Sequence, residues 1–415
     1  MLTTSPPGRL ASTWAVLLRR AGWILAGSLA VHLVLTVLAT DMFDLKVYYQ
    51  GAPSLLHGRL YDFVLHRADP NAAQLPFTYP PFAALLFLPL SALPWAAAAT
   101  VWQLLSLASL ALLVHCSFRL LGRGHQRRHA MLWFALALWL EPVKHGLDLG
   151  QIDLVLAAVV LAGITYGRSL AAGAGVAVAA GVKLVPAITG LYFLVTRQWR
   201  AACWSAVVFF ATVGVAWAVD PAESHRYWFE LLGDPSRIGQ VASFENQSLR
   251  GALARTLGHD GGMSPLWCAL ALGMALAAAP ALRTAARHGE ALAVLVVTQL
   301  LGLLYSPISW SHHWVWFLPT LICLVHGPAR HSAVGRLAIG AWLAATGSWL
   351  VPAAGHAAAH VASGHAVPWY LIALDWCYPV CALLSFLALA LAPRPAPAAG
   401  VRMPHQEAVP APALD

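Results

Sequence analysis

Acidic side chains follow directly on a long apolar run near the start of the chain. Asp41 and Asp44 are three residues apart, and they precede Lys46 in the sequence. If this segment is helical, both carboxylates lie on one face of the helix. Partial burial would raise the pKa of such a carboxylate toward neutrality, which suits a general base. The structural alternative is that both aspartates end the apolar run and pair with Lys46.

Aromatic and hydroxyl groups gather in two further stretches, Leu56–Asp62 and Leu75–Phe82. Sugar rings stack on aromatic faces, so Tyr79 in the second stretch and Tyr48, shortly after Asp44, are candidates for substrate binding. The alternative for the second stretch is an aromatic belt at a lipid–water boundary, followed by a helix that starts at proline. The sequence leaves both interpretations open.

Charged groups interrupt the apolar sequence again in the middle of the chain. The group comprises Glu141, Lys144, His145, Asp148 and Asp153, with Gln151 among them as a candidate substrate contact. Charge is costly at membrane depth, so such residues either pair with one another or line a wet cavity. Lys183, one of three lysines, is a candidate phosphate ligand. Its alternative is to extend to the membrane surface.

Two later stretches complete the set of candidates. Ser243–Gly251 supplies Asn246, Gln247 and Arg250, and Arg250 is either a bidentate phosphate ligand or an ordinary solvated charge. Tyr305–Trp314 supplies His312 and His313. Adjacent histidines do not share a helical face and no HExxH-like spacing is present, so we predict no metal site. One histidine is expected to donate to a substrate or phosphate oxygen, and the other to pack. Asp375 is a further charge in an apolar run and is expected to pair with a histidine or arginine.

Long apolar runs must position all these groups. The chain has 415 residues, of which 59% are hydrophobic and 10% charged, whereas soluble proteins average about 25% charged residues. The runs 21–40, 201–219, 262–282 and 376–392 contain no Asp, Glu, Lys or Arg, and their length matches the thickness of a bilayer. The chain is therefore predicted to be an all-α polytopic membrane protein. Its net charge of +8 lies in short arginine loops and does not indicate nucleic-acid binding.

The arginine loops also predict a topology. We expect about twelve transmembrane helices, at 21–40, 95–118, 130–143, 150–167, 169–182, 184–196, 199–219, 265–282, 290–304, 314–327, 334–351 and 368–391. The first is expected to be retained rather than cleaved as a signal peptide. Arginine-rich loops mark the cytoplasmic side, which leaves both termini inside and the outer segments 41–80 and 220–262 outside. These outer segments hold ten of the seventeen acidic residues. Segment 80–93 is too short to cross and is predicted to be re-entrant or interfacial.

Taken in order, the polar stretches resemble glycosyltransferase family 87, a family of actinobacterial mannosyltransferases. The resemblance covers about residues 40–320. Its motifs are Asp44-Leu45-Lys46-Val47-Tyr48, His57-Gly58-Arg59-Leu60-Tyr61-Asp62, Phe77-Thr78-Tyr79-Pro80-Pro81-Phe82, Gly150-Gln151-Ile152-Asp153, Val182-Lys183-Leu184-Val185-Pro186, Asn246-Gln247-Ser248-Leu249 and Ser306-Pro307-Ile308-Ser309-Trp310-Ser311-His312-His313. The chain departs from the family at Asp153, where asparagine is common.

The resemblance implies a GT-C fold in the plasma membrane, with an extracytoplasmic active site, short interfacial helices and no cofactor. Residues 1–392 would form the catalytic domain, and the Pro- and Ala-rich segment 393–415 a disordered cytoplasmic tail. The implied donor is polyprenyl-phosphate-mannose, and the implied acceptor is a glycolipid such as a phosphatidylinositol mannoside. The product would carry an α-1,2 linkage.

The resemblance also implies that Asp44 is the catalytic base. Inversion at the anomeric carbon needs one base for the acceptor hydroxyl and stabilisation of the departing phosphate. Cationic candidates for the phosphate are His312, His313, Lys183 and Arg250, and Lys46 is a further candidate for substrate binding. One alternative is a GT-C transferase for another polyprenyl-phosphate sugar, such as arabinofuranose. Another is a secondary transporter, but we find no internal repeat.

Overall fold

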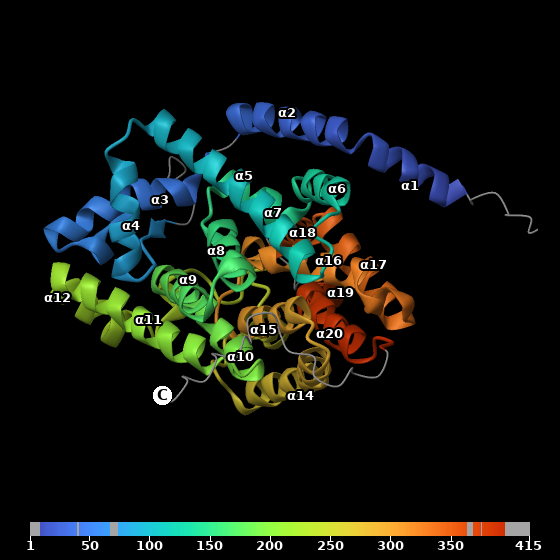
Figure 1. Ribbon diagram of the computed structural model, residues 1–415. Helices are drawn as coiled ribbons and strands as arrows, with labels where there is room; N and C mark the ends of the chain where they lie inside the picture. Colours follow the sequence, from blue (N-terminus) through green and yellow to red (C-terminus); the bar gives the residue numbers. More distant parts are fainter. Residues whose placement is uncertain (1–8, 40, 67–73, 363–367, 375, 395–415) are drawn as a thin grey trace, which may run out of the picture.

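The computed structural model describes residues 9–39, 41–66, 74–362, 368–374 and 376–394, and this part of the chain is almost wholly helical (Figure 1). Its α-helices are α1 (Arg9–Arg19), α2 (Ala21–Ala39), α3 (Phe43–Gly51), α4 (Pro81–Ser91), α5 (Trp95–Leu120), α6 (Arg127–Ala137), α7 (Glu141–Leu149), α8 (Asp153–Tyr166), α9 (Ser169–Val182), α10 (Thr189–Val195), α11 (Trp199–Val219), α12 (Pro221–His225), α13 (Leu249–Leu257), α14 (Pro265–Arg287), α15 (Ala291–Tyr305), α16 (Phe317–His326), α17 (Ala333–Gly347), α18 (Leu350–Ala362), α19 (Trp369–Leu374) and α20 (Cys377–Ala390). Shorter elements are η1 (Ala52–His57), η2 (Leu60–Asp62), η3 (Val185–Ile188), the π-helix η4 (Arg226–Leu231), η5 (Pro235–Arg237), η6 (Ser311–Trp316), η7 (Pro328–His331), β1 (Val64–Leu65) and β2 (Leu75–Pro76). The predicted all-α class is confirmed.

Four helices in the described part are long and apolar enough to cross a membrane: α2, α5, α11 and α14. Two bent pairs raise the number to six if each pair is one span, namely α7 with α8 and α17 with α18. Most other predicted spans are helices of 10–17 residues. At about 1.5 Å per residue such a helix is shorter than the roughly 30 Å hydrocarbon core, so the twelve crossings stay a prediction.

Several predicted boundaries differ from those of the structure. The predicted span 368–391 is divided into α19 and α20, and Asp375 between them lies outside the described residues, as does most of 393–415. The charged stretch after α6 forms its own helix, α7, which meets α8 at 116°. Segment 80–93 contains the predicted short helix, α4, with proline in its first turn.

The helical body is held together by close pairs of helices. Helix α9 lies along α11, α5 along α8, and α14 packs against both α15 and α20 (Figure 1). Gly173 permits the first of these contacts, because a Cβ atom there would lie 2.6 Å from the carbonyl oxygen of Ala201. Small residues are the usual means by which membrane helices approach closely. Helix α15 is buried along nearly its whole length and forms the centre of the core.

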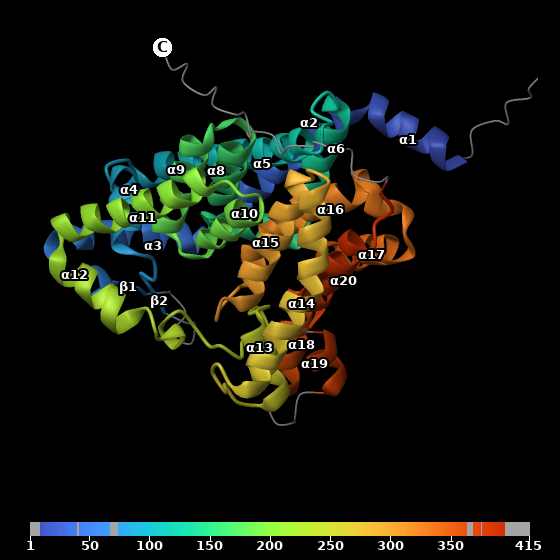
Figure 2. The ribbon, with the colours of Figure 1, turned by 60° about the horizontal axis from the view of Figure 1, so that its bottom comes forward.

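The two polar segments that we predicted to lie outside contact each other. The amide of Tyr61 donates to Glu223 at 2.7 Å, and Arg226 forms an ion pair with Asp62 at 2.7 Å. Arg237 donates to the carbonyl of Thr78 at 2.9 Å. Figure 2 shows β1, β2 and α12 close together beyond the ends of the long helices. The described residues of these two segments therefore meet at one end of the helical body.

Candidate active site

Helix α3 carries the acidic residue with the strongest case for chemistry. The helix begins at Phe43, after Met42 with a left-handed φ of 45°. Asp44 therefore lies in the first turn, where the helix dipole favours an anion. Asp41 lies outside the helix with an exposed side chain and is 3.8 Å from Lys46. The prediction that Asp41 and Asp44 share a helical face is wrong because the helix starts between them.

Asp44 is bound to an amide rather than to a lysine. The side-chain amide of Gln151 donates to Oδ2 of Asp44 at 2.7 Å. The Oε1 atom of Gln151 accepts from the hydroxyls of Tyr48 and Tyr79, at 3.1 and 3.2 Å, and these hydroxyls are 2.8 Å apart. Four of the predicted site residues thus form one connected network, drawn from α3, the chain before α4, and the turn between α7 and α8.

A glycine explains how Gln151 reaches Asp44. Helix α7 ends at Gly150, whose φ of 71° is the left-handed conformation of a helix C-cap. A Cβ atom at Gly150 would also lie 2.7 Å from the Cβ atom of Leu45 in α3. Glycine is therefore required at this position, where it ends the helix against α3, and the next side chain, Gln151, reaches the carboxylate.

The environment of Asp44 changes its acidity. Burial raises the pKa of Asp44 to about 6, although the hydrogen bond from Gln151 and the charge of Lys183 act in the opposite direction. At pH 7 the carboxylate is mostly ionised, yet it is more basic than an exposed aspartate. This balance suits a group that must accept a proton near neutral pH.

Lys183 directly follows α9 and lies on the other side of the network. Its ammonium donates to both oxygens of Asp153, at 2.9 and 2.8 Å, and lies 5.5 Å from the ring centroid of Tyr79. Nε2 of His313 is 4.0 Å from Asp153. Asp153, where we noted the departure from the family, therefore neutralises the lysine that we predicted to bind phosphate.

The histidine pair lies in η6, the connection between α15 and α16, and both side chains are buried. The two rings are 4.7 Å apart. Burial and the neighbouring charge of Lys183 hold the pKa values of His312 and His313 well below their usual range, and the neighbouring histidines add to this for His312. The lowered pKa values favour neutral imidazoles, and a cationic role of either ring toward a bound phosphate stays a prediction.

Three nitrogens of this pair have no hydrogen-bond partner among the described residues: Nδ1 and Nε2 of His312, and Nδ1 of His313. A buried polar group without a partner costs about 1–3 kcal/mol, and proteins rarely leave one so. A ligand oxygen beside these rings would accept from one N–H of each neutral ring. The cavity next to His313, Lys183 and Asp153 is about 20 Å³ and holds about one water molecule. The site is therefore closed around its own ion pair.

Helix α7 supports the histidine pair through a residue that we did not single out for this role. Glu141 is fully buried and accepts from the hydroxyls of Ser311 and Tyr378, at 2.7 and 2.5 Å. It also lies 3.2 Å from Nδ1 of His145, whose ring is 5.1 Å from that of His312. One of our two interpretations of the charged stretch from Glu141 to Asp153 was mutual pairing, and the structure shows such pairs. Lys144 with Asp148 is a second example. Nothing in the sequence marked Tyr378 as a partner of this group, because it lies in an apolar run.

The remaining candidates hold the second outer segment in place. Asn246 is fully buried, donates to the carbonyl of Pro307 at 3.1 Å, and accepts from the amide of Ser309 at 2.9 Å. The amide of Gln247 donates to the carbonyl of Ser309 at 2.8 Å. Both residues thus hold the loop that leads to the histidines.

Two charged candidates already have partners of their own. Arg250 forms a bidentate pair with Asp260, at 2.9 and 2.8 Å, and Lys46 lies 3.8 Å from Asp41 and 5.2 Å from the ring centroid of Phe43. The predicted substrate contacts of Asn246, Gln247, Arg250 and Lys46 stay predictions. No three metal-ligating side chains come together in the part of the chain described here.

Comparison with known proteins identifies the family. The sequence profile of glycosyltransferase family 87 matches residues 77–307. A polyprenol-phosphate-mannose-dependent alpha-(1-2)-phosphatidylinositol pentamannoside mannosyltransferase of Mycolicibacterium smegmatis is 45% identical over 83% of this chain and 84% of its own length. The protein of the same name from Mycobacterium tuberculosis is 41% identical over 92% of this chain and 88% of its own length.

A polyprenol-phosphate-mannose-dependent alpha-(1-2)-phosphatidylinositol mannoside mannosyltransferase of Mycobacterium tuberculosis is 34% identical over 73% of this chain and 75% of its own length. No solved structure matches the chain. The family match covers more than half of the chain, and the matched range contains Tyr79, Gln151, Lys183 and Asn246. This chain is a membrane protein that belongs to glycosyltransferase family 87.

Proposed function

We propose that this glycosyltransferase transfers mannose from polyprenyl-phosphate-mannose to the 2-hydroxyl of a mannose on a phosphatidylinositol mannoside, with inversion, to give an α-1,2 linkage. The names of the relatives at 45% and 41% identity support the donor, the acceptor class and the linkage. The observation that carries the mechanism is the partly buried Asp44, held by Gln151 in a network that reaches Lys183 through Tyr79.

The proposed chemistry is one in-line displacement. Oδ2 of Asp44 is held by Gln151, and Oδ1 has no hydrogen-bond partner among the described residues. We assign Oδ1 to the proton of the acceptor 2-hydroxyl. As the acceptor oxygen bonds to the anomeric carbon, the bond from that carbon to the phosphate oxygen breaks. The proton passes to Asp44, and polyprenyl phosphate leaves with the bonding electrons, so one base is sufficient.

The departing phosphate needs donors that are already in place. Lys183 supplies positive charge, and the unpaired ring nitrogens of His312 and His313 supply neutral hydrogen bonds. Such prearranged donors are among the largest contributions to catalysis. Because the cavity beside them is about 20 Å³, donor binding requires the Lys183–Asp153 pair to separate. Asp153 then competes with the phosphate for the lysine.

The other candidates receive roles in the same proposal. Tyr48 and Tyr79 place their hydroxyls beside Gln151, and we assign these hydroxyls, rather than the buried rings, to the sugar. Asn246 and Gln247 position the loop that carries the histidine pair. Arg250 and Lys46 lie toward the surface and are assigned to the charged headgroup of the glycolipid acceptor.

We further propose a GT-C fold with about twelve membrane crossings in the plasma membrane and residues 1–392 as the catalytic domain. Asp44 would face the extracytoplasmic side. Both termini would lie in the cytoplasm, with a disordered tail at 393–415. The convergence of Arg123, Arg330 and Arg394 around one cavity supports this orientation, since arginine loops stay in the cytoplasm.

The orientation has a direct test. In a background from which the exposed Cys203 and Cys268 have been removed, a thiol at Glu230, which has a 59% exposed side chain, should react with an impermeant reagent in intact cells. A thiol at Arg127 should react only after the membrane is opened. The reverse pattern would contradict the orientation.

The function is tested with purified protein and defined lipids. Incubation with polyprenyl-phosphate-mannose and a phosphatidylinositol mannoside should add one or more mannoses, and linkage analysis should find 2-linked mannose in the product. Transfer only from another lipid-linked sugar would contradict the mannosyl donor. Solute uptake into vesicles without any glycosidic product would favour a transporter instead.

A further inference from the structure

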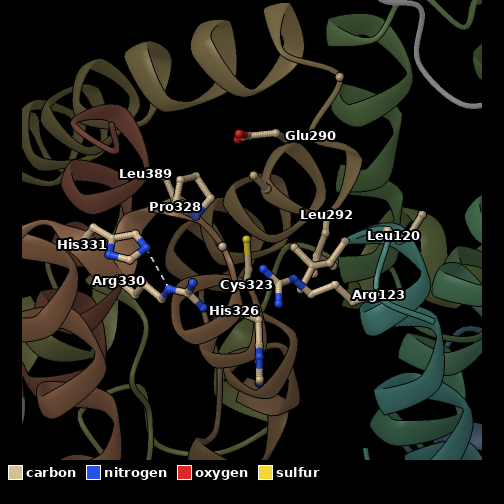
Figure 3. A pocket seen from close by; sticks show the side chains of 15 residues that line it. Leu120, Arg123, Glu290, Leu292, Cys323, His326, Pro328, Arg330, His331 and Leu389 are labelled. Atoms are coloured by element: carbon tan, nitrogen blue, oxygen red, sulfur yellow. Dashed lines mark hydrogen bonds between the residues drawn. The ribbon is translucent and has the colours of Figure 1, made fainter. Parts of the chain in front are cut away.

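A cavity of about 600 Å³ lies far from Asp44, at the opposite ends of α5, α15 and α16 (Figure 3). Its walls include Leu120 at the end of α5, Glu290 just before α15, and His326 at the end of α16. Helix α15 runs from this cavity to the loop that carries the histidine pair, a distance of about 22 Å at 1.5 Å per residue. The volume is in the range of ligand sites, and the proposed reaction does not use it.

The charge of this cavity is positive and not balanced from within. Arg123 and Arg330 point toward each other across it, as Figure 3 shows, and both act electrostatically on His326. Glu290 is the one carboxylate among the described lining residues, and Arg394 already binds it in a bidentate pair at 2.9 and 2.7 Å. Two guanidinium groups that face each other without a counter-ion repel, so the cavity favours an anion.

The donors that surround the cavity match a phosphate group. The Nε atom of Arg330 donates to His331 at 3.0 Å, which directs the two terminal nitrogens of Arg330 inward. Nε2 of His326 accepts from the indole of Trp133 at 2.8 Å, so the neutral ring carries its proton on Nδ1. The two arginine forks form a donor set typical of phosphate recognition, and the His326 ring beside them is neutral.

The rest of the lining is apolar. Leu120, Leu121, Leu292 and Leu389 border the charged groups, and the helices that bring them there belong to the membrane body. A ligand with a phosphate and hydrocarbon chains would satisfy both parts of the wall, as would a smaller phosphate compound that uses only the arginines.

We propose that this cavity is a second ligand site, separate from the active site, that binds a phosphate group through Arg123 and Arg330. The phosphate belongs either to an anionic membrane lipid or to a soluble phosphate compound. In the proposed orientation the site opens to the cytoplasmic side, but binding does not depend on that orientation or on the proposed reaction.

The test uses the full-length protein, purified in detergent and stripped of lipid. Native mass spectrometry measures binding of phosphatidylglycerol, with diacylglycerol of the same chains as the probe without phosphate. The double variant Arg123→Gln/Arg330→Gln is compared with Arg127→Gln/Arg128→Gln, which removes two exposed arginines next to the same loop. We expect about tenfold weaker phosphatidylglycerol binding in the first variant, no change in the second, and no specific binding of diacylglycerol.

Thermal unfolding with millimolar inorganic phosphate separates the two sources. Stabilisation of the wild type but not of Arg123→Gln/Arg330→Gln would assign the site to a soluble phosphate. Lipid binding without this stabilisation would assign it to a phospholipid. Equal binding of every phosphate probe by wild type and variant would overturn the proposal, as would equal binding of diacylglycerol and phosphatidylglycerol. If the double variant unfolds, Arg330→Gln alone, at an exposed position, replaces it.

Discussion

The hydrogen bond from Gln151 to Asp44 makes a quantitative prediction about pH. Gln151 donates to Oδ2 of Asp44 at 2.7 Å and opposes the effect of burial, which raises the pKa of that carboxyl to about 6. Gln151→Leu removes the donor and leaves the burial, so the carboxylate loses support in its charged form. The pKa of Asp44 should therefore rise further.

The size of the shift follows from the strength of the bond. A hydrogen bond to a charged group contributes about 1.5–3 kcal/mol, and one pKa unit corresponds to about 1.4 kcal/mol. The pKa should rise by about 1 to 2 units, from about 6 to between about 7 and 8. Because the base must be ionised, activity at pH 6 should fall roughly 5- to 50-fold relative to wild type, while activity at pH 9 should differ much less.

The assay is kcat/KM for mannosyl transfer between pH 5 and 9, which reports the pKa of the free enzyme. The wild-type profile should rise through about pH 6, and that of Gln151→Leu at a higher pH. Gln151→Glu, which places a second carboxylate beside the first, should shift the profile at least as far. Gln103→Leu removes a buried glutamine that bonds His32 instead of Asp44 and serves as the control. A wild-type profile that is flat between pH 5 and 7.5, or an unshifted profile in both Gln151 variants, would refute the reasoning.

Further predictions concern the groups around the base. Lys183→Met should lower transfer about 10²- to 10³-fold, because it removes a group that donates hydrogen bonds to the departing phosphate. The double variant Lys183→Met/Asp153→Asn should regain thermal stability but not activity. Recovered turnover in the double variant would make the role of the lysine purely structural. Asp153→Asn should reduce the KM for the donor severalfold, because it frees Lys183 from its carboxylate partner, and an unchanged or higher KM would exclude that competition. Glu141→Gln should destabilise the protein by about 2–4 kcal/mol, measured by denaturant unfolding, because two hydroxyls lose a buried carboxylate acceptor. Turnover should persist in a strong chelator, and restoration of lost activity by one divalent ion would reveal a metal site.

Much of the candidate site follows from residue type and order. Asp44, Gln151, Tyr48 and Tyr79 come from three separate stretches, and the structure joins them in one network. A carboxylate, an amide and phenols next to apolar runs are costly without partners, but residue type left several interpretations open, and only the ordered resemblance to one family indicated a common site. Their pairing is set by the turn at Gly150, and residue type alone could not give the partner of each group.

The supporting residues were harder to predict. Tyr378 lies in an apolar run, yet its hydroxyl binds Glu141. Asp153 was noted only as a departure from the family, and its ion pair with Lys183 depends on how α8 meets the end of α9. Long-range partners of this kind depend on tertiary packing, which periodicity does not report.

The helix boundaries show a similar limit. Hydropathy located α2, α5, α11 and α14, whose length matches a bilayer. It did not reveal the bend of 116° between α7 and α8, nor the division between α19 and α20. Apolar composition is the same for a span that crosses straight and one that is broken, so the number of crossings cannot be read from hydropathy alone.

The central claim is that Asp44 accepts the proton of the acceptor hydroxyl. Asp44→Asn keeps the size of the side chain and removes the charge, so it should lower kcat for mannosyl transfer by about 10²- to 10⁴-fold. Its thermal unfolding temperature should be unchanged or higher at pH 8, since the native state no longer holds a carboxylate whose pKa burial has raised. Turnover within a few fold of wild type by a folded Asp44→Asn protein would contradict the account.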